Sequence, residues 1–416
     1  MPNPLNLPSG ASFEAVALAD GQRPPAMKTG LRVGLLAGEA SGDNLGAGLM
    51  HRLKELHPDI EFIGVGGERM QAAGLTSLLA LSELSVNGFR DPIVKLPTLI
   101  RHYRNLVQAF SAADLDAFLG IDFNVFNFLV EGALKKRGVK TAHYVSPSVY
   151  AWRRGRTRRV AKVADMILCL FPFEPAFYAD TDVEAVFVGH PLADSIELDS
   201  GSDNARRAAR QALGIAESDV VLALLPGSRS SEVQLMLPEF LGAAAHFSDH
   251  CRSAGEACQV VIPCVRPELR SMIEAALPGY PGLACLTYDG VATEALKACD
   301  VALVKSGTST LETMLLHRPM VVSYRLGNLS YQLARRLLKS PFVALPNILA
   351  GRELVPELLQ HAATAEALAQ ALIKERAASG APDYFAPFIA LHEQLRGQAD
   401  LTAAKAMLRL MGVGDR

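Results

Sequence analysis

Short apolar runs recur along the chain, and most are followed by a turn of small or polar residues and then by an apolar pattern of helical period. This alternation predicts parallel β-strands joined by crossover helices. In the first half of the chain the runs cover residues 31–37, 61–65, 117–121, 141–145, 166–171 and 185–188. In the second half they cover residues 221–225, 259–262, 283–286, 301–304, 320–324 and 342–345. The pattern therefore predicts an α/β protein with two successive blocks of sheet.

A polar stretch over residues 195–205 separates the two blocks and is the best candidate for a linker. At 416 residues the chain is too long for one compact core, so two domains are expected. We place them at residues 30–194 and 195–384, with C-terminal helices over residues 385–416. Residues 1–29 are rich in Pro, Ala and Gly and lack periodicity, which predicts a mobile extension, with Met27 as an alternative start.

The stretch 301–314 combines a buried strand, a glycine turn and the start of a helix. In this arrangement the backbone N–H groups of Gly307, Thr308 and Ser309 face the space above the sheet together with the positive end of the helix, which favours an anion. The alternative is a capping box, in which Glu312 only satisfies the Ser309 N–H.

A second turn of this kind follows the strand at residues 221–225. It contains Ser228 and Arg229 and leads directly into a helix. Arg229 could bind a phosphate with two hydrogen bonds, a charge-assisted contact worth about 1.5–3 kcal/mol. Alternatively, it forms a local ion pair with Glu232, worth less than ~1 kcal/mol if exposed. Two anion-type turns in one block favour a phosphate ligand.

The N-terminal block places polar residues directly after its strands, at the edge where ligands of such sheets bind. The candidates are Glu39 and Ser41 in the turn 38–43, Asp122 and Asn127 after residues 117–121, Ser146 after residues 141–145, and His190 after residues 185–188. Asp122 is the candidate general base, although an aspartate there is as often a helix cap. His190 could act as an acid or base, but a histidine between Gly and Pro is more often structural or a hydrogen-bond partner of the substrate.

Two segments mix apolar and basic residues. The first, residues 85–106, has apolar side chains at Phe89, Ile93, Leu96 and Ile100, and suits either a membrane-surface helix or an ordinary helix packed on the sheet. The second, residues 153–162, begins with Arg153 and Arg154 and could bind a phosphate or anionic lipid, or form a solvated helix face.

Composition excludes several classes. A net charge of −2 gives no overall attraction to nucleic acid, and no GxGxxG or P-loop motif occurs. The six cysteines have no metal-ligand spacing, so neither a metal site nor a cofactor is expected. No apolar run approaches the ~20 residues that span a bilayer, and no signal-peptide pattern is present. We therefore expect a cytoplasmic protein.

Together these motifs resemble the lipid-A-disaccharide synthases, glycosyltransferases of the GT-B fold. The resemblance covers about residues 30 to 412. The segments that carry it are GEASGD (38–43), GID (120–122), HYVSPSVYAW (143–152), LLPGSR (224–229), SGTSTLE (306–312) and PNILAGREL (346–354). It implies two Rossmann-like domains facing across a cleft, with the C-terminal helices returning to the N-terminal domain.

The resemblance also implies an inverting transfer of 2,3-diacylglucosamine from its UDP derivative to 2,3-diacylglucosamine 1-phosphate (lipid X), giving a β-1′,6 linkage. Asp122 would be the base, and the N-terminal domain would hold the acceptor at a site that includes Glu39, Ser41, Asn127, Ser146 and His190. UDP would bind to Arg229, Ser228, Gly307, Thr308, Ser309, Glu312 and Asn347. The two basic and apolar segments would bind the enzyme peripherally to the cytoplasmic face of the inner membrane. The sequence leaves open whether the chain forms a homodimer.

Two departures from the family pattern matter. Where the family commonly has Pro-Asp-Phe-Asn, this chain has Asn124-Val125-Phe126-Asn127, so a second carboxylate is missing. Where the family usually has Trp-Ala-Trp, this chain has Tyr150-Ala151-Trp152. Three rival functions remain: a UDP-sugar 2-epimerase, a murein-type UDP-GlcNAc transferase and a non-enzymatic nucleotide-sugar sensor. Dependence on an acylated acceptor separates the disaccharide synthase function from the epimerase, and an undecaprenyl acceptor distinguishes the murein-type transferase. Any UDP release with the acceptor would exclude the sensor.

Overall fold

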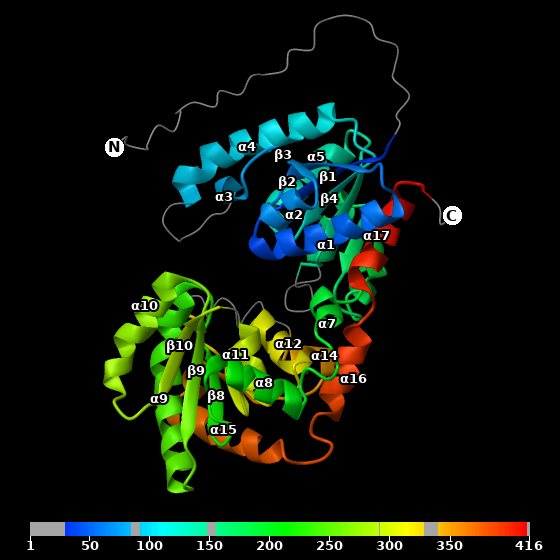
Figure 1. The fold of residues 1–416 in the computed structure, drawn as a ribbon. Coiled ribbons are helices and arrows are strands. Elements are labelled where there is room, and N and C mark those ends of the chain that lie inside the picture. The colour runs from blue at the N-terminus through cyan, green and yellow to red at the C-terminus, as the bar shows by residue number, and fades with distance from the viewer. Residues whose placement is uncertain (1–29, 85–91, 148–154, 291, 328–339, 414–416) are drawn as a thin grey trace, which may run out of the picture.

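The computed structural model describes residues 30–84, 92–147, 155–290, 292–327 and 340–413, which form the two α/β domains seen in Figure 1. The N-terminal domain contains a seven-stranded sheet of order β3-β2-β1-β4-β5-β6-β7. Its strands are β1 Arg32–Ala37, β2 Glu61–Val65, β3 Leu75–Ser77, β4 Ala117–Ile121, β5 Lys140–Tyr144, β6 Met166–Cys169 and β7 Glu184–Phe187. All neighbouring strands run parallel, as the buried apolar runs predict.

The C-terminal domain contains a six-stranded parallel sheet of order β10-β9-β8-β11-β12-β13. Its strands are β8 Val220–Leu225, β9 Cys258–Cys264, β10 Cys285–Asp289, β11 Val301–Lys305, β12 Met320–Tyr324 and β13 Glu357–Leu359. In both sheets the strand order reverses once, between β1 and β4 and between β8 and β11. Ligands of open parallel sheets bind at such a reversal, outside the carboxyl ends of the strands.

The strand predicted at residues 342–345 is wrong. The carboxylate of Glu357 accepts the backbone N–H groups of Val343 and Ala344, so these groups do not join a ladder, and α14 begins at Leu345. The sixth strand is instead β13, whose residues are half-buried and form no apolar run. Strand β3 was missed for a similar reason, because two of its three residues are exposed.

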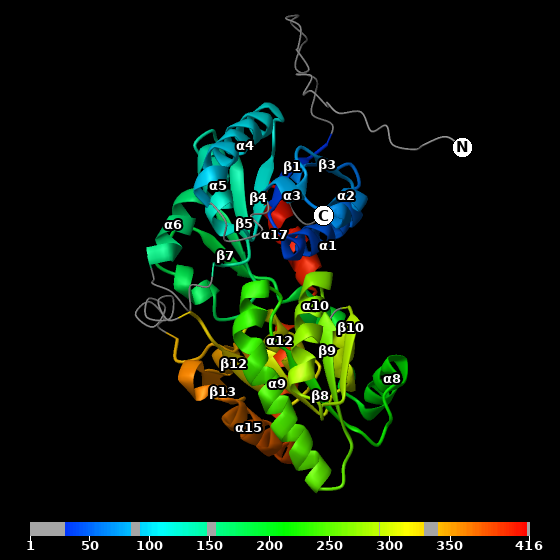
Figure 2. The same cartoon turned by 90° about the vertical axis from the view of Figure 1, so that its left-hand side faces the viewer.

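Helices cover both faces of each sheet. Those of the N-terminal domain are α1 Ala40–Leu56, α2 Glu68–Ala72, α3 Leu81–Leu84, α4 Pro92–Ala112, α5 Asn124–Lys135, α6 Gly155–Val163, the 3₁₀ turn η1 Pro175–Tyr178 and α7 Pro191–Ser195. Those of the C-terminal domain are α8 Asp203–Leu213, α9 Ser230–Ser253, α10 Pro267–Ala276, η2 Leu277–Gly279, α11 Ala292–Ala298, α12 Thr308–Leu315, α14 Leu345–Ala350, η3 Gln360–Ala362 and α15 Ala365–Ala378. Figure 2 shows the long helix α9 beside α15.

Alternate residues of the central strands point to opposite faces, as the period of a strand requires. In β1, Val33 and Leu35 belong to the core under α1, whereas Leu36 packs in a second cluster with Phe110 of α4 and Phe118 of β4. All of these side chains are fully buried. Within the described residues, no helix is long and apolar enough to cross a membrane.

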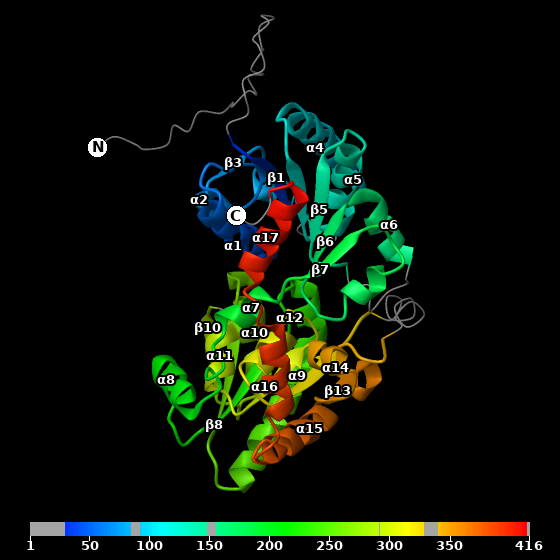
Figure 3. The same cartoon turned by 90° about the vertical axis from the view of Figure 1, so that its right-hand side faces the viewer.

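The last two helices connect the domains. Helix α16, Ala386–Leu395, packs against α12 and α14 of the C-terminal domain and against α7, and α17, Ala399–Leu410, packs on α1 of the N-terminal domain (Figure 3). The carboxylate of Asp194 in α7 accepts the N–H groups of Gly397, Gln398 and Ala399, at 3.0, 3.1 and 2.6 Å, and so caps the start of α17. The C-terminal helices thus return to the N-terminal domain of their own chain.

We predict that Asp194→Ala weakens the docking of α17. Three N–H groups lose their acceptor, and loss of such a cap costs about 0.5–2 kcal/mol. Hydrogen exchange of the α17 amides should become faster, while the amides of β8 and β11 exchange as in the wild type. Asp199→Ala, at an exposed site shortly after α7, is the matched control. Unchanged exchange in α17 would contradict the capping role.

Candidate active site

The two glycine turns of the C-terminal domain lie side by side. Strands β8 and β11 are direct neighbours, and Leu225 pairs with Val304 at their carboxyl ends. The turns that follow therefore leave the sheet next to each other, with Ser228 and Arg229 on one and Gly307 on the other. Helices α9 and α12 begin at these turns. Their N-cap residues, Arg229 and Gly307, make no side-chain capping hydrogen bond. Two uncapped helix N-termini meet here, which favours an anion.

An ion pair fills the space between the turns. The ammonium group of Lys305 donates to Glu232 Oε1 at 3.0 Å, and the N–H of Ser228 donates to Glu232 Oε2 at 3.3 Å. A guanidinium nitrogen of Arg229 lies 3.9 Å from Glu232 Oε1, but the Arg229 side chain is 70% exposed. The predicted alternative of a local Arg229–Glu232 ion pair is therefore realised only as a long contact, and Lys305 is the main partner.

The capping-box alternative for α12 is wrong. The helix begins at Thr308 with Gly307 as its N-cap, and no side chain caps it. Glu312 Oε1 instead accepts from the hydroxyl of Thr293 at 2.5 Å, and burial raises the pKa of its carboxyl group. The Thr308 side chain is exposed and that of Ser309 half-buried, so the helix start stays open to a ligand.

The side chain of Asn347 makes its hydrogen bonds inside the protein. It is fully buried in α14, where its amide nitrogen donates to Val355 O and Glu357 Oε1 and its oxygen accepts from the N–H groups of Leu354 and Val355. This contradicts direct contact of the side chain with a nucleotide. Its hydrogen bonds hold the loop after α14 in place.

Asp122 lies at the carboxyl end of β4, half-buried, beside the end of β1. Asp122 and Phe123 both adopt left-handed backbone angles, with φ of 49° and 45°. Such angles cost a non-glycine residue about 1–2 kcal/mol, so other contacts must hold this turn. One is the Phe123 ring, which lies where Gly38 leaves room: a Cβ on Gly38 would be 2.2 Å from the ring.

Asn127 provides the other contacts. It is fully buried, and its amide nitrogen lies 3.2, 3.3 and 2.8 Å from the carbonyl oxygens of Leu36, Ile121 and Asp122. The prediction that Asn127 contacts the acceptor is therefore contradicted, because this side chain ties the turn of Asp122 to strands β1 and β4.

The other N-terminal candidates occupy the same sheet edge. Glu39 and Ser41 are exposed in the first turn of α1. Ser146 is buried after β5, with its hydroxyl 2.8 Å from that of Tyr178. His190 caps α7, because its Nδ1 accepts the N–H of Leu192, and burial lowers the pKa of its imidazole to about 4. His190 therefore has a structural contact and a neutral imidazole at physiological pH, and its role in acid–base chemistry or substrate binding stays a prediction.

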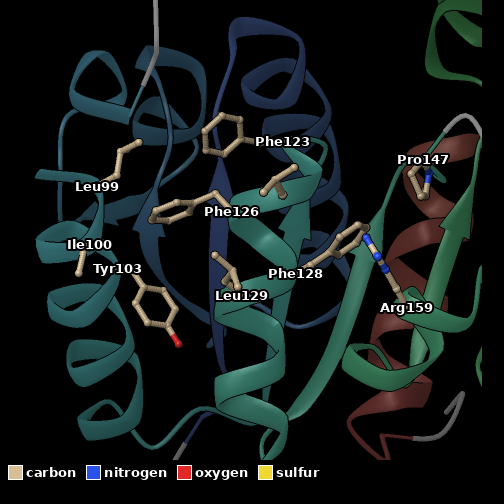
Figure 4. Close-up of a pocket in the computed structure, with 10 residues that line it drawn as sticks. Leu99, Ile100, Tyr103, Phe123, Phe126, Phe128, Leu129, Pro147 and Arg159 are labelled. Atoms are coloured by element: carbon tan, nitrogen blue, oxygen red, sulfur yellow. The ribbon is translucent and has the colours of Figure 1, made fainter. Parts of the chain in front are cut away.

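An apolar cavity of about 670 Å³ opens beside this edge, between α4 and α5 (Figure 4). Leu99, Ile100 and Tyr103 of α4 line one side, and Phe126 and Leu129 of α5 the other. Phe123, Val125, Phe128, Pro147 and Arg159 complete the lining. Val125 is 80% exposed and Leu129 56% exposed, so apolar surface stands open to solvent.

Helix α4 contains most of the segment 85–106, for which a membrane-surface helix and an ordinary packed helix were the two alternatives. Leu106, the last residue of that segment, is buried against the sheet together with Val107 and Phe110, so α4 packs as an ordinary helix from Leu106 onward. Ile100 instead lies at the cavity, 43% exposed. Phe89, Arg153, Arg154 and Tyr150 lie outside the described residues, and the side chains of Ile93 and Leu96 are likewise outside the description.

Comparison with known proteins identifies the family. A family model for lipid-A-disaccharide synthetase matches residues 33–407. The lipid-A-disaccharide synthase of Azotobacter vinelandii is 47% identical over 91% of this chain and 98% of that protein. The chain belongs to the lipid-A-disaccharide synthase family. The lipid-A-disaccharide synthase of Pseudomonas aeruginosa strain LESB58 is 46% identical over 92% of this chain and 99% of its own length.

Solved structures share the fold at low identity. A putative UDP-N-acetylglucosamine 2-epimerase from Listeria monocytogenes aligns over 93% of this chain and 98% of that chain, with a TM-score of 0.61 and 12% identity. MurG of Acinetobacter baumannii aligns over 90% and 94%, with a TM-score of 0.50 and 13% identity. The predicted GT-B fold with two parallel-sheet domains is confirmed, as is membership in a glycosyltransferase family.

Two features of the site were not predicted from the sequence: the Lys305–Glu232 ion pair and the apolar cavity. A lysine that ends a buried strand was a usable signal, because a charge there needs a partner. The cavity had no comparable signal, since the space between α4 and α5 depends on how the two helices pack on the sheet. Val125, which replaces the usual family aspartate, lines this cavity and makes it more apolar.

We predict that Asn127→Ala destabilises the N-terminal domain. The buried carbonyl groups of Leu36, Ile121 and Asp122 would lose their donor, and one buried unsatisfied group costs about 1–3 kcal/mol. Urea unfolding should show a lower midpoint. Asn204→Ala, at an exposed side chain of α8 that bonds only within its own helix, should leave the midpoint nearly unchanged. A wild-type midpoint for the Asn127 variant would refute its role as the anchor of the turn.

Proposed function

We propose that this protein transfers 2,3-diacylglucosamine from UDP-2,3-diacylglucosamine to the 6-hydroxyl of 2,3-diacylglucosamine 1-phosphate. The products are UDP and the β-1′,6-linked disaccharide 1-phosphate of lipid A. The observation that carries the proposal is the placement of an anion-binding pair of turns in one domain and of a carboxylate beside an apolar cavity in the other. Family membership supports the same assignment.

The C-terminal domain would bind the donor. Arg229 is exposed at the end of one turn and free to rotate toward a diphosphate, while Gly307, Thr308 and Ser309 offer the open start of α12. Glu312 would contact the ribose hydroxyls. Together the start of α12 and the guanidinium group of Arg229 would stabilise the negative charge that develops on UDP as it leaves.

Asp122 would act as the general base. As the acceptor oxygen attacks the anomeric carbon, its proton passes to the Asp122 carboxylate, the bond from that carbon to the phosphate oxygen breaks, and the electron pair leaves with UDP. Direct attack from the opposite face inverts the configuration. The strained turn held by Asn127 would fix the carboxylate in place for this step.

The apolar cavity would take acyl chains of the acceptor. Burial of each methylene group contributes about 0.8 kcal/mol, so an acyl chain in the cavity supplies much of the binding energy. Arg159, an exposed cation in the lining, would face the 1-phosphate. Glu39, Ser41 and Ser146 would contact the sugar.

The same surface would associate with the membrane. The start of α4 and the basic segment 153–162 would lie on the cytoplasmic face of the inner membrane, where each basic residue contributes about 1 kcal/mol toward anionic lipid. Acylated substrates could then enter the cavity without crossing water. No cofactor and no nucleic acid take part in this scheme.

The configuration of the product tests the reaction. The protein is incubated with both lipid substrates in detergent, and the disaccharide is analysed by NMR. A β-linked disaccharide supports direct displacement, and an α-linkage would contradict it. Conversion of UDP-GlcNAc to its 2-epimer, without disaccharide, would favour the epimerase alternative.

We predict that Asp122→Asn lowers kcat by about 10²–10⁴-fold, because an amide cannot accept the acceptor proton. UDP affinity should stay as in the wild type, since Asp122 belongs to the other domain. Turnover is measured with both substrates and UDP affinity by calorimetry. Wild-type turnover in this variant would remove Asp122 from the base role.

We predict that Leu129→Ser raises KM for the acylated acceptor by about ten-fold, which corresponds to about 1.4 kcal/mol of lost acyl contact. Leu129 is more than half exposed in the ligand-free protein, so folding stability should change little. Leu235→Ser, at an exposed leucine of α9 in the other domain, is the matched control. Equal KM values for the two variants would argue against acyl binding at the cavity.

A further inference from the structure

The Lys305–Glu232 ion pair bridges the two glycine turns. A Cβ on Gly307 would lie 3.7 Å from Lys305 Nζ, and a Cβ on Gly227 would lie 3.0 Å from Glu232 Oε2. Each member of the pair therefore lies over one of the glycines, and the two charges meet between them at 3.0 Å. Their side chains are only 17% and 15% exposed.

The donors and the cation that contact Glu232 among the described residues also suit a phosphate. Its carboxylate accepts from the Ser228 N–H and from Lys305, lies near the Arg229 guanidinium and sits within the first turn of α9. Lys305 is fixed further by the ring of Tyr324, whose centroid is 5.0 Å from Nζ. The carboxylate of Glu232 thus lies among donors arranged for an anion.

We propose that Glu232 occupies the position of a donor phosphate in the ligand-free protein, and that Lys305 transfers from Glu232 to the diphosphate when UDP-sugar binds. This inference rests on the proposed function, which supplies the diphosphate. Lys305 is then a direct ligand of the leaving group. Glu232 keeps Lys305 in place between turnovers and competes with UDP for it, which favours release of the product.

The charges support this exchange. With Glu232 present, the pair is neutral and attracts a diphosphate weakly. When the carboxylate moves aside, the ammonium group, the Ser228 N–H and the start of α12 together face the incoming anion. An ammonium–phosphate contact is a charge-assisted hydrogen bond, which is roughly twice as strong as a hydrogen bond between neutral groups. A purely structural ion pair between β11 and α9 would instead affect stability and leave nucleotide affinity unchanged.

Calorimetry with UDP and UMP on three full-length proteins tests the proposal: the wild type, Glu232→Gln, and the double variant Glu232→Gln with Lys305→Met. The double variant removes the ammonium group without leaving an unpaired buried carboxylate, so comparison with Glu232→Gln isolates the contribution of Lys305. Glu274→Gln removes a carboxylate from an exposed ion pair on α10 and controls for the change in net charge. Thermal unfolding of each protein records stability separately.

We expect Glu232→Gln to bind UDP several-fold more tightly than the wild type. The double variant should bind UDP at least about ten-fold more weakly than Glu232→Gln, with a smaller loss for UMP, which lacks the second phosphate. Glu274→Gln should match the wild type. Equal UDP affinity of Glu232→Gln and the double variant would overturn the proposal, as would weaker binding by Glu232→Gln.

Two further outcomes are separable. If Glu232→Gln does not fold, Lys305→Met is compared with the wild type instead. This variant leaves the Glu232 carboxylate without its lysine, so the comparison no longer isolates the ammonium group, but equal affinity for UDP still overturns the proposal. If the wild type itself binds no UDP, the proposed function fails. If the wild type binds UDP and replacement of Lys305 leaves the affinity unchanged, only the proposed role of Lys305 fails.

Discussion

The structure depends on the parallel pairing of strands on either side of a reversal in strand order. In the C-terminal domain, pairing of β8 with β11 places two glycine turns next to each other, although Ser228 and Gly307 are far apart in the chain. In the N-terminal domain, pairing of β1 with β4 brings Gly38 beside Phe123 and sets Asp122 at the sheet edge. Local sequence determines each turn, but strand pairing determines which turns act together.

Both sites keep polar or charged groups away from water, and the two sites pair these groups in different ways. Under Asp122, the amide of Asn127 supports a backbone turn with unfavourable angles, and beneath it a fully buried pair, Glu131 and His143, lies at 2.7 Å. A Cβ on Gly120 would be 2.2 Å from that glutamate, which explains the glycine before Ile121. Between the glycine turns, Lys305 and Glu232 neutralise each other. The first arrangement is rigid, whereas the second can exchange partners with a ligand.

The sequence predicted the fold class and most strands because buried parallel strands form continuous apolar runs. It failed at β3 and β13, which are short and partly exposed, and at residues 342–345, where Glu357 binds the backbone instead of a strand. Candidate residues at strand ends were placed correctly at the sheet edges. Asn127 and Asn347 were misjudged, because a motif shows that a polar residue is needed but not whether it faces a ligand or the backbone. The cavity between α4 and α5 arises only from tertiary packing.

In the proposed reaction a sugar passes from a UDP donor to an acylated acceptor, and this chain's own residues stabilise the charge on the leaving group. Release of UDP from UDP-2,3-diacylglucosamine is measured in detergent and EDTA, with and without 2,3-diacylglucosamine 1-phosphate. Rapid release is expected only when the acceptor is present. Absence of release with both substrates, or release at the same rate without the acceptor, would contradict the proposed reaction.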